Sequence, residues 1–239
     1  MPSISEKTAG KRNSFGGDYL TPMLSNIFFD LDGTLTDSKE GIVNCIYYAL
    51  EKLGYPVPEG FNVNDCLGPP LRISFRRLLN SNDEALIERA VAIYRERFST
   101  IGLFENKVYP GIPELLSSLQ ENSLKLYIVT TKPKVFADRI IEHFQLAHRF
   151  EAIYGTELNG QFDNKADLIE FILKTRQLKA EETMMVGDKK EDIVAGKANR
   201  TGTIGVTYGY GSLEEITEAA PDDICGNPEE IKSTITGMR

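Results

Sequence analysis

The chain has 239 residues, 41% of them apolar, which is enough for one large α/β domain or for a domain with a substantial insertion. Its 35 acidic and 27 basic residues give a formal charge of −8, so no overall positive field favours a nucleic acid polymer or a membrane as partner. The three cysteines form no CxxC or CxxH pattern, and no run approaches about 18 apolar residues, so we expect a cytoplasmic protein without disulfides, a zinc site or a membrane span.

Taken in chain order, the first 23 residues differ from the rest. Residues 1–23 are rich in Ser, Gly, Lys and Pro and show no hydrophobic period, which predicts a flexible leader. Compact runs that are apolar on both faces then predict buried parallel strands at 27–29, 124–129, 183–186 and 203–206. Helical spacing predicts helices at 112–121, 133–145, 164–176 and 189–199. This alternation predicts an α/β fold, a doubly wound Rossmann-like parallel sheet with helices on both sides.

A long segment separates the first two predicted strands. A simple crossover between parallel strands needs about a dozen residues, so the excess predicts a separate domain. Its helical spacing at 42–54, 71–79 and 84–98 predicts an all-α insertion, or cap, after the first strand. We therefore expect a leader at 1–23, a core formed by 24–37 and 108–239, and a helical cap at 38–107.

Polar side chains follow the buried runs or begin helices at four points: Asp30, Thr130, Lys165 and Asp188. Ligands bind beyond the carboxyl ends of parallel strands, so these groups are expected to converge on one edge. The set suits phosphoryl transfer. A carboxylate that approaches a phosphate ester meets a repulsion of roughly 4 kcal/mol per contact at an effective dielectric of ~20, so cations must offset it. Asp30 and Asp188 can hold Mg²⁺, and Lys165 supplies a second positive charge.

The segment "DLDGTLTD" at residues 30–37 supplies two chemical roles. Asp30 is the candidate nucleophile, because a carboxylate that attacks phosphorus forms an aspartyl phosphate and splits one difficult displacement into two. Asp32 projects to the same side if the chain stays extended, where it can protonate the leaving oxygen and then deprotonate water. The Thr130 hydroxyl can hold phosphate oxygens. Gly33 permits a sharp departure from the strand, and Thr34 is expected to brace the loop.

These segments also resemble a known family. "DLDGTLTD", "VTTK" at 129–132, Lys165 in "NKADLI" and "GDKKED" at 187–192 are similar, in order and spacing, to the four signatures of the haloacid dehalogenase-like hydrolases. The resemblance covers about residues 25–237. "LGPPLRISF", "VYPGIPELLSSL" and "GVTYGYGSLEEI" further resemble the phosphoglycolate phosphatase-like branch, whose helical cap lies between the first two motifs.

The resemblance implies specific roles. Asp30 would be the nucleophile, Asp32 the acid and base that also gives a backbone carbonyl to Mg²⁺, and Asp188 a metal ligand, while Asp192 would orient Lys165 or a metal-bound water. Thr131 stands where many relatives have Asn, which leaves contacts of that side chain open. Haloacid dehalogenases proper lack the second aspartate of the first motif, so Asp32 argues against dehalogenation.

Each motif also has a purely structural interpretation. The DxDGT segment alone could be a turn, Asp188 a helix N-cap, Lys165 and Asp192 exposed charges, and Thr130 the end of a strand. The four motifs in order favour the catalytic interpretation. Arg72 and Lys132 are candidate substrate contacts, although a solvated helix face is the alternative for Arg72. Other polar residues are left outside the catalytic set: Asp37 as a cap or loop residue, His143 and His148 as structural or exposed, and 208–211 as a loop at the edge of the site.

The sequence thus predicts a Mg²⁺-dependent phosphatase that acts on a small phosphorylated metabolite. Phosphoglycolate, nucleoside monophosphates, sugar phosphates and pyrophosphate all stay open as substrates. A phosphomutase of the β-phosphoglucomutase type is the nearest alternative, and a non-catalytic sensor of a phosphorylated ligand is another. We expect no nucleic acid polymer and no membrane as partner, and a monomer or a homodimer.

Overall fold

The computed structural model describes residues 23–158 and 161–238, so the predicted leader lies outside the described residues except for Met23. The described part forms a six-stranded parallel sheet in the order β5-β4-β1-β6-β7-β8. The strands are β1 (Asn26–Phe29), β4 (Lys125–Pro133), β5 (Ala152–Thr156), β6 (Thr183–Gly187), β7 (Gly202–Val206) and β8 (Asp223–Cys225). The predicted α/β fold is confirmed.

The first strand lies at the centre of this sheet, and the strand order reverses there. From β1 the chain adds β4 and β5 on one side and β6, β7 and β8 on the other. Phe29, the last residue of β1, lies level with Ile128 of β4 and Val186 of β6. The residues that follow these three strands therefore meet at one edge, at the point where ligands bind in sheets of this kind.

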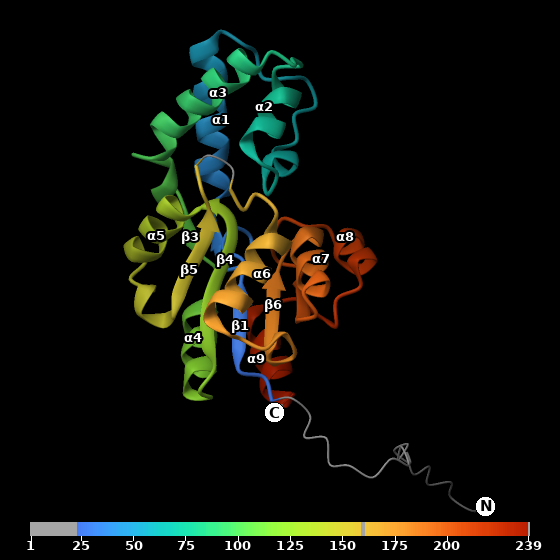
Figure 1. Cartoon of the computed structure of the whole chain (residues 1–239). Helices are drawn as coiled ribbons and strands as arrows, with labels where there is room; N and C mark the ends of the chain where they lie inside the picture. The colour runs from blue at the N-terminus through green and yellow to red at the C-terminus, as the bar shows by residue number, and fades with distance from the viewer. Residues whose placement is uncertain (1–22, 159–160, 239) are drawn as a thin grey trace, which may run out of the picture.

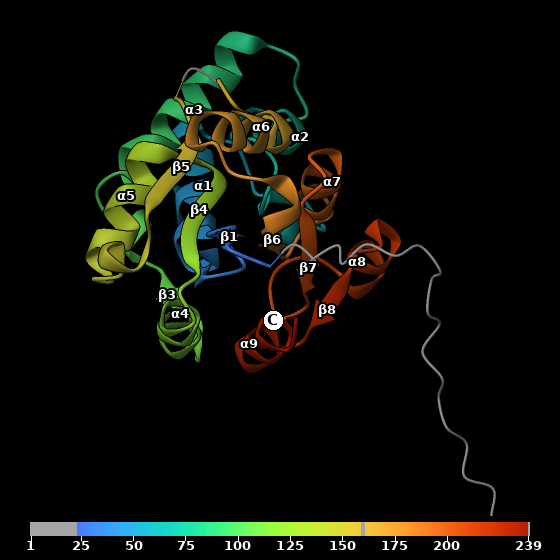
Figure 2. The same ribbon diagram turned by 60° about the horizontal axis from the view of Figure 1, so that its bottom comes forward.

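Both faces of the sheet are covered by helices because neighbouring residues of each strand are apolar. Ile27 and Phe29 belong to the larger hydrophobic core, and Phe28 belongs to a second one on the opposite face. The larger core includes α4 (Ile112–Glu121), α5 (Lys134–His143) and α9 (Pro228–Gly237), and the second includes α6 (Lys165–Arg176) and α7 (Lys190–Ala198). Figure 2 shows the sheet between α4 and α5 on one side and α6 and α7 on the other.

Three helices lie beyond the carboxyl ends of the strands (Figure 1): α1 (Lys39–Leu53), α2 (Leu71–Leu78) and α3 (Glu84–Phe98). They form the all-α insertion after the first strand that the sequence predicts. Gly54 ends α1 in the left-handed conformation with φ of 74°, and the Asp83 side chain caps α3 by accepting from the backbone N–H groups of Ala85 and Leu86. Buried Phe75 and Tyr94 pack edge to face between α2 and α3.

A second, two-stranded sheet marks where the chain enters and leaves these helices. β2 (Thr36–Asp37) pairs antiparallel with β3 (Lys107–Val108). The two connections between the large sheet and the three helices therefore run side by side. The limits of the cap domain, 38–107, stay a prediction.

The sequence missed several short elements. β5, β8, α8 (Leu213–Ala219) and α9 were not expected, and β4 continues to Pro133 although the predicted strand ended at 129. β5 and β8 are edge strands whose outer residues are only partly buried, so they lack a run that is apolar on both faces. Four 3₁₀ helices complete the described elements: η1 (Val63–Cys66), η2 (Gly102–Phe104), η3 (Ala147–Arg149) and η4 (Ala180–Glu182).

None of the helices within residues 23–158 and 161–238 combines the length and apolar character needed to cross a membrane.

Candidate active site

The first motif forms a tight loop at the end of β1. The backbone N–H groups of Leu35 and Thr36 donate to the carbonyl of Leu31, and the Gly33 N–H donates to the carbonyl of Thr36. Gly33 has φ of 84°, and a Cβ built there would lie 2.2 Å from Asp188 Oδ2. Only glycine satisfies both conditions. The loop therefore turns sharply after Asp30 and lets Asp188 approach its backbone.

Asp188 follows β6 and is fully buried. Its Oδ1 accepts a hydrogen bond from the Thr34 hydroxyl at 3.1 Å, and its Oδ2 accepts one from the backbone N–H of Tyr210 at 2.8 Å. Thr34 thus holds the Asp188 carboxylate as well as forming part of the loop. These two bonds fix the carboxylate between the first motif and the 208–211 loop.

Lys165 begins α6 and its ammonium is buried beside two carboxylates. Its Nζ lies 3.0 Å from Asp30 Oδ1 and also donates to Asp192 Oδ1. Burial alone lowers the pKa of Lys165, but the charges of Asp192 and Asp30 outweigh it and raise the pKa above its ordinary value. The other oxygen of Asp192 accepts from the backbone N–H of Lys189 at 3.0 Å. Asp192 is therefore occupied on both oxygens.

The three carboxylates form a dense acidic cluster. One oxygen each of Asp30, Asp188 and Asp192 lies within 4.8 Å of the others. Burial, followed by the charges of Asp192 and Asp30, raises the pKa of Asp188 to about 8. Burial also raises the pKa of Asp192 to about 6, although Lys165 opposes the shift. One ammonium thus faces three carboxylates, and the remaining negative charge fits a divalent cation held through hard oxygen ligands.

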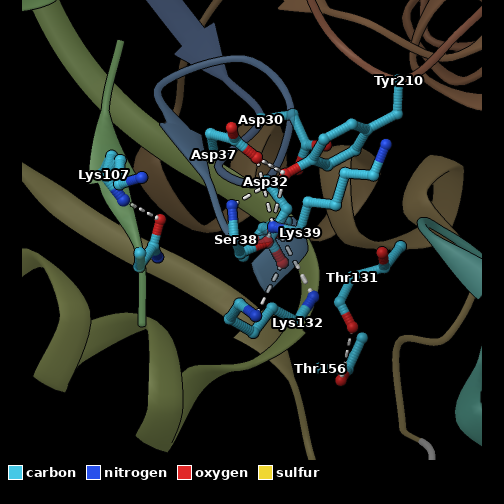
Figure 3. A network of polar contacts seen from close by, with 12 residues as sticks. Asp30, Asp32, Asp37, Ser38, Lys39, Lys107, Thr131, Lys132, Thr156 and Tyr210 are labelled. Carbon is cyan, nitrogen blue, oxygen red and sulfur yellow. Dashed lines mark hydrogen bonds and ion pairs between the residues drawn. The ribbon is translucent and has the colours of Figure 1, made fainter. Parts of the chain in front are cut away.

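Asp32 is not part of that cluster, and its charged partner comes from β4. Its Oδ2 forms an ion pair with Lys132 Nζ at 2.7 Å (Figure 3). The same ammonium lies 4.7 Å from the ring centroid of Phe98, which belongs to α3. Thr130 is buried in β4, and its Oγ1 accepts from the backbone N–H of Lys132 at 3.2 Å. Lys132 therefore contacts the second aspartate of the first motif and an aromatic ring of the helical insertion.

A cavity of about 140 Å³ opens between the sheet edge and the helical insertion. Asp30, Asp32, Thr130 and Lys132 line it from the sheet, and the helices contribute side chains that include Arg72, Tyr94, Arg95 and Phe98. A second cavity, of about 550 Å³, shares Asp30 and Thr131 but is not lined by Asp32. Of the predicted site residues, Lys165 and Asp192 line this second cavity together with Asp30, and Asp188 is fully buried beside them.

Arg72 lies at the smaller cavity, but its guanidinium already has a partner. It forms a two-point ion pair with Glu88 of α3, through Nε to Oε1 and through Nη2 to Oε2 at 3.2 Å. The sequence could not show this pairing, because the two residues lie on different helices.

Tyr210 has contacts that the sequence did not indicate. Its hydroxyl donates to Asp37 Oδ1 at 3.0 Å and accepts from the backbone N–H of Ser38 at 2.7 Å (Figure 3). Asp37 also accepts from the backbone N–H of Lys39, so it holds the start of α1. The 208–211 loop was expected at the edge of the site with no chemistry. Its tyrosine instead connects Asp188 to the start of the helical insertion.

Asp30 at the end of the central strand, Lys165 and Asp188 beside it and a helical layer over the same edge define a class of α/β hydrolase. Consistent with this, residues 27–206 match the family described as haloacid dehalogenase-like hydrolase. The chain belongs to that family, and it is an enzyme of the phosphatase type.

Individual relatives carry several names. A 5'-nucleotidase from Pseudomonas aeruginosa is 41% identical over 88% of this chain and 95% of that protein. The tyrosine-protein kinase PtkA from Mycobacterium tuberculosis is 34% identical over 81% of this chain and 66% of that protein. A phosphoglycolate phosphatase from Vibrio parahaemolyticus is 28% identical over 87% of this chain and 95% of that protein.

A solved structure agrees with the fold. The crystal structure of a predicted phosphatase from Clostridium acetobutylicum is 40% identical in sequence and superposes with a TM-score of 0.84. The match covers 90% of this chain and 99% of that one. The similarity therefore includes the sheet and the helical insertion together.

Proposed function

We propose that the chain is a Mg²⁺-dependent phosphatase that hydrolyses a small phosphate monoester through an aspartyl phosphate on Asp30. One observation carries the proposal: Asp30 lines a cavity together with Asp32, and the same carboxylate lies against the Lys165 ammonium and the Asp188 carboxylate. Asp30 Oδ1 is buried and accepts no hydrogen bond from the described residues, although the Lys165 ammonium is close. The charge of Lys165 thus holds the Asp30 carboxylate in place at the wall of the cavity.

The residues that would hold Mg²⁺ are Asp30, Asp188 and the backbone carbonyl of Asp32. When bound, the ion would offset the repulsion between the phosphate and the nearby carboxylates. Asp192 would orient Lys165, because its two oxygens are taken by the Lys165 ammonium and the Lys189 N–H.

The remaining steps belong to side chains of this chain. The Asp30 carboxylate attacks phosphorus and the bond from phosphorus to the ester oxygen breaks. Asp32, which must enter this step protonated, gives that oxygen its proton. Asp32 then takes a proton from a water molecule that attacks the same phosphorus, which releases phosphate and restores Asp30. Lys132 fixes the orientation of Asp32 through their ion pair. Thr130 is the proposed donor to the phosphate oxygens.

The helical insertion at 38–107 is the proposed cap that selects the substrate, with Arg72 and Lys132 as proposed substrate contacts. Relatives named as a nucleotidase and as phosphoglycolate phosphatases support a small phosphate monoester. The cytoplasmic location and the monomer or homodimer stay predictions from the sequence.

The test is release of free phosphate from a panel of small phosphate esters, with Mg²⁺ and with a chelator. We expect Asp30→Asn to lower kcat/KM by about 10⁴-fold or more, as is found when a nucleophile is removed. Asp138→Asn is the matched control, since Asp138 lies on the surface of α5 and pairs with Lys134. Full activity of Asp30→Asn, or equal activity in the chelator, would contradict the proposal.

The same assay separates the alternatives. A phosphomutase would convert a sugar phosphate into its isomer and release little phosphate. A non-catalytic sensor would bind an ester without turnover in either form.

A further inference from the structure

Arg95 of α3 lies at the cavity that Asp30 and Asp32 line, and it is half-buried there. Its Nε is buried without a hydrogen-bond partner. Among residues 23–158 and 161–238, no carboxylate forms an ion pair with its guanidinium. A guanidinium always carries its charge in proteins and offers five N–H donors, so the cavity contains a cation without a counterpart.

The neighbouring charges do not neutralise Arg95. Glu88 of the same helix acts on Arg95 electrostatically, but both its oxygens are already taken by Arg72. Burial, followed by the charge of Arg72, lowers the pKa of Arg95, while Glu88 and Asp163 act in the opposite direction without reaching ion-pair distance. The charged form of Arg95 is therefore disfavoured in the free protein and would gain from an added anion.

The position of Asp32 indicates which part of the substrate meets Arg95. Asp32 is the proposed acid for the leaving oxygen, and it lines the smaller cavity but not the larger one. The leaving group therefore extends into the smaller cavity, past the aromatic wall of Tyr94 and Phe98, which stack at 5.4 Å. Arg95 lies on the same helix as that wall.

We infer that Arg95 binds a second anionic group on the leaving-group part of the substrate, so that preferred substrates are phosphate monoesters that carry a carboxylate or a second phosphate. This inference rests on the proposed function and narrows it. A planar guanidinium can hold either anion through two parallel hydrogen bonds. An ester whose leaving group is neutral would leave Arg95 without its partner.

The test compares esters that differ only in the second anion. One pair is 2-phosphoglycolate and 2-hydroxyethyl phosphate, and the other is 1,3-propanediol bisphosphate and 3-hydroxypropyl phosphate. Charge-assisted hydrogen bonds make a preference of about 10- to 100-fold in kcat/KM reasonable for the anionic member of one pair. The pair that shows the preference identifies the anion as carboxylate or phosphate. Equal kcat/KM within both pairs would overturn the inference.

Variants assign that preference to Arg95. In Arg95→Gln the ester with an anionic leaving group loses its advantage, mainly through a higher KM. The ester with a neutral leaving group keeps its kcat/KM within about threefold. Arg95→Lys keeps part of the preference because it keeps the charge. Arg89→Gln is the matched control, since Arg89 is an exposed residue of the same helix. An equal loss on both members of each pair in Arg95→Gln would mean a structural role and overturn the inference.

Asp163 provides the remaining distinction. The alternative is that Arg95 serves only to pair with Asp163 when the helices approach the sheet. In that case Asp163→Asn will have the same effect as Arg95→Gln on every ester. That result would contradict substrate recognition by Arg95. We expect Asp163→Asn to leave the preference in place. Hydrolysis of the esters with a neutral leaving group measures the proposed function separately. Phosphatase activity without a preference for an anionic leaving group therefore rejects only this inference. Absence of turnover on every ester would reject both.

Discussion

The acidic cluster at the sheet edge and the inner face of α3 border the same site. They differ in whether their charged side chains have partners within the protein. At the sheet edge, Lys165, Asp188 and Asp192 each have two polar or charged partners from other parts of the chain. On α3, Arg95 has no ion-pair partner in the part of the chain that the structure describes. The first arrangement is complete without an organic substrate, and the second is not.

This difference separates reactivity from selectivity. The groups proposed for the reaction are held by bonds within the protein, which keeps them in place before substrate arrives. The group proposed to recognise the leaving group is left for the ligand to complete. Breaking a bond in the first region should therefore change stability and rate for every ester, whereas changes in the second should depend on which ester is used.

The largest effect on stability is expected at Lys165. Lys165→Met leaves Asp30 and Asp192 buried without their shared cation, and breaking a buried ion pair in this way costs about 3–5 kcal/mol. Urea unfolding measures the loss. The double variant Lys165→Met with Asp192→Asn should recover part of it, because one uncompensated charge is also removed.

Lys174→Met is the control for the Lys165 variant. Lys174 lies on the same helix, is exposed and pairs with Glu170 at 2.7 Å. Its loss should cost less than about 1 kcal/mol. Equal destabilisation by the two variants would contradict the compensating role of Lys165.

The acidic cluster should also make stability depend on pH when no divalent cation is present. Asp188 has a folded pKa of about 8 against an ordinary value of 3.8, so the folded chain retains a proton that the unfolded chain releases. The free energy of unfolding should therefore fall as pH rises from about 4 to about 8. The pKa of Asp192, raised to about 6, adds to the same trend.

Urea unfolding at several pH values in a chelator tests this dependence. Asp188→Asn should flatten it, and added Mg²⁺ should stabilise the protein more at pH 8 than at pH 5, because the ion competes with the retained protons. Asp138→Asn, an exposed aspartate, should leave the dependence unchanged. A free energy of unfolding that rises with pH in the chelator would contradict the raised pKa values of Asp188 and Asp192.

A smaller effect is expected at Tyr210, which joins the two regions. Burial raises the pKa of Tyr210, so its hydroxyl stays protonated and donates to Asp37. Tyr210→Phe also leaves the buried N–H of Ser38 without its acceptor, which should cost about 1–3 kcal/mol in urea unfolding. Tyr208→Phe removes one bond, to the carbonyl of Thr34, and should cost less. A greater loss in Tyr208→Phe would show that the Ser38 contact is unimportant.

The smallest effect is expected at an ion pair on the outer side of the helices. Arg76 pairs with Glu84 at 2.6 Å, with both side chains exposed. Arg76→Gln should cost less than about 1 kcal/mol and leave kcat/KM unchanged for every ester. A change in kcat/KM confined to esters with an anionic leaving group would mean that α2, rather than Arg95, binds the leaving group.

The sequence predicted the sheet edge well because its residues occur in short motifs beside buried strands. Asp30 follows β1, Asp188 follows β6 and Lys165 begins α6, so strand ends alone bring them together. The short edge strands β5 and β8 were missed, since a few half-buried residues carry little periodic signal.

The helical side of the site was less predictable. The sequence offered Arg72 as a substrate contact, and the structure pairs Arg72 with Glu88. Arg95 was not singled out. Whether an arginine on an amphipathic helix is paired depends on how two helices pack, which no local pattern records. Tyr210 was missed for the same reason, as its partners lie about 170 residues earlier in the chain.

The paired strands β2 and β3 give the helical insertion a single attachment. Thr36 lies opposite Val108 and Asp37 opposite Lys107, so the two ends of the insertion are one strand spacing apart, about 4.8 Å. A gap of that size can be closed by a tight turn or opened again by any segment whose own ends lie close together. We therefore expect the helices to be exchangeable as a cassette, with chimeras that keep the catalytic sheet and take their choice of substrate from the donor.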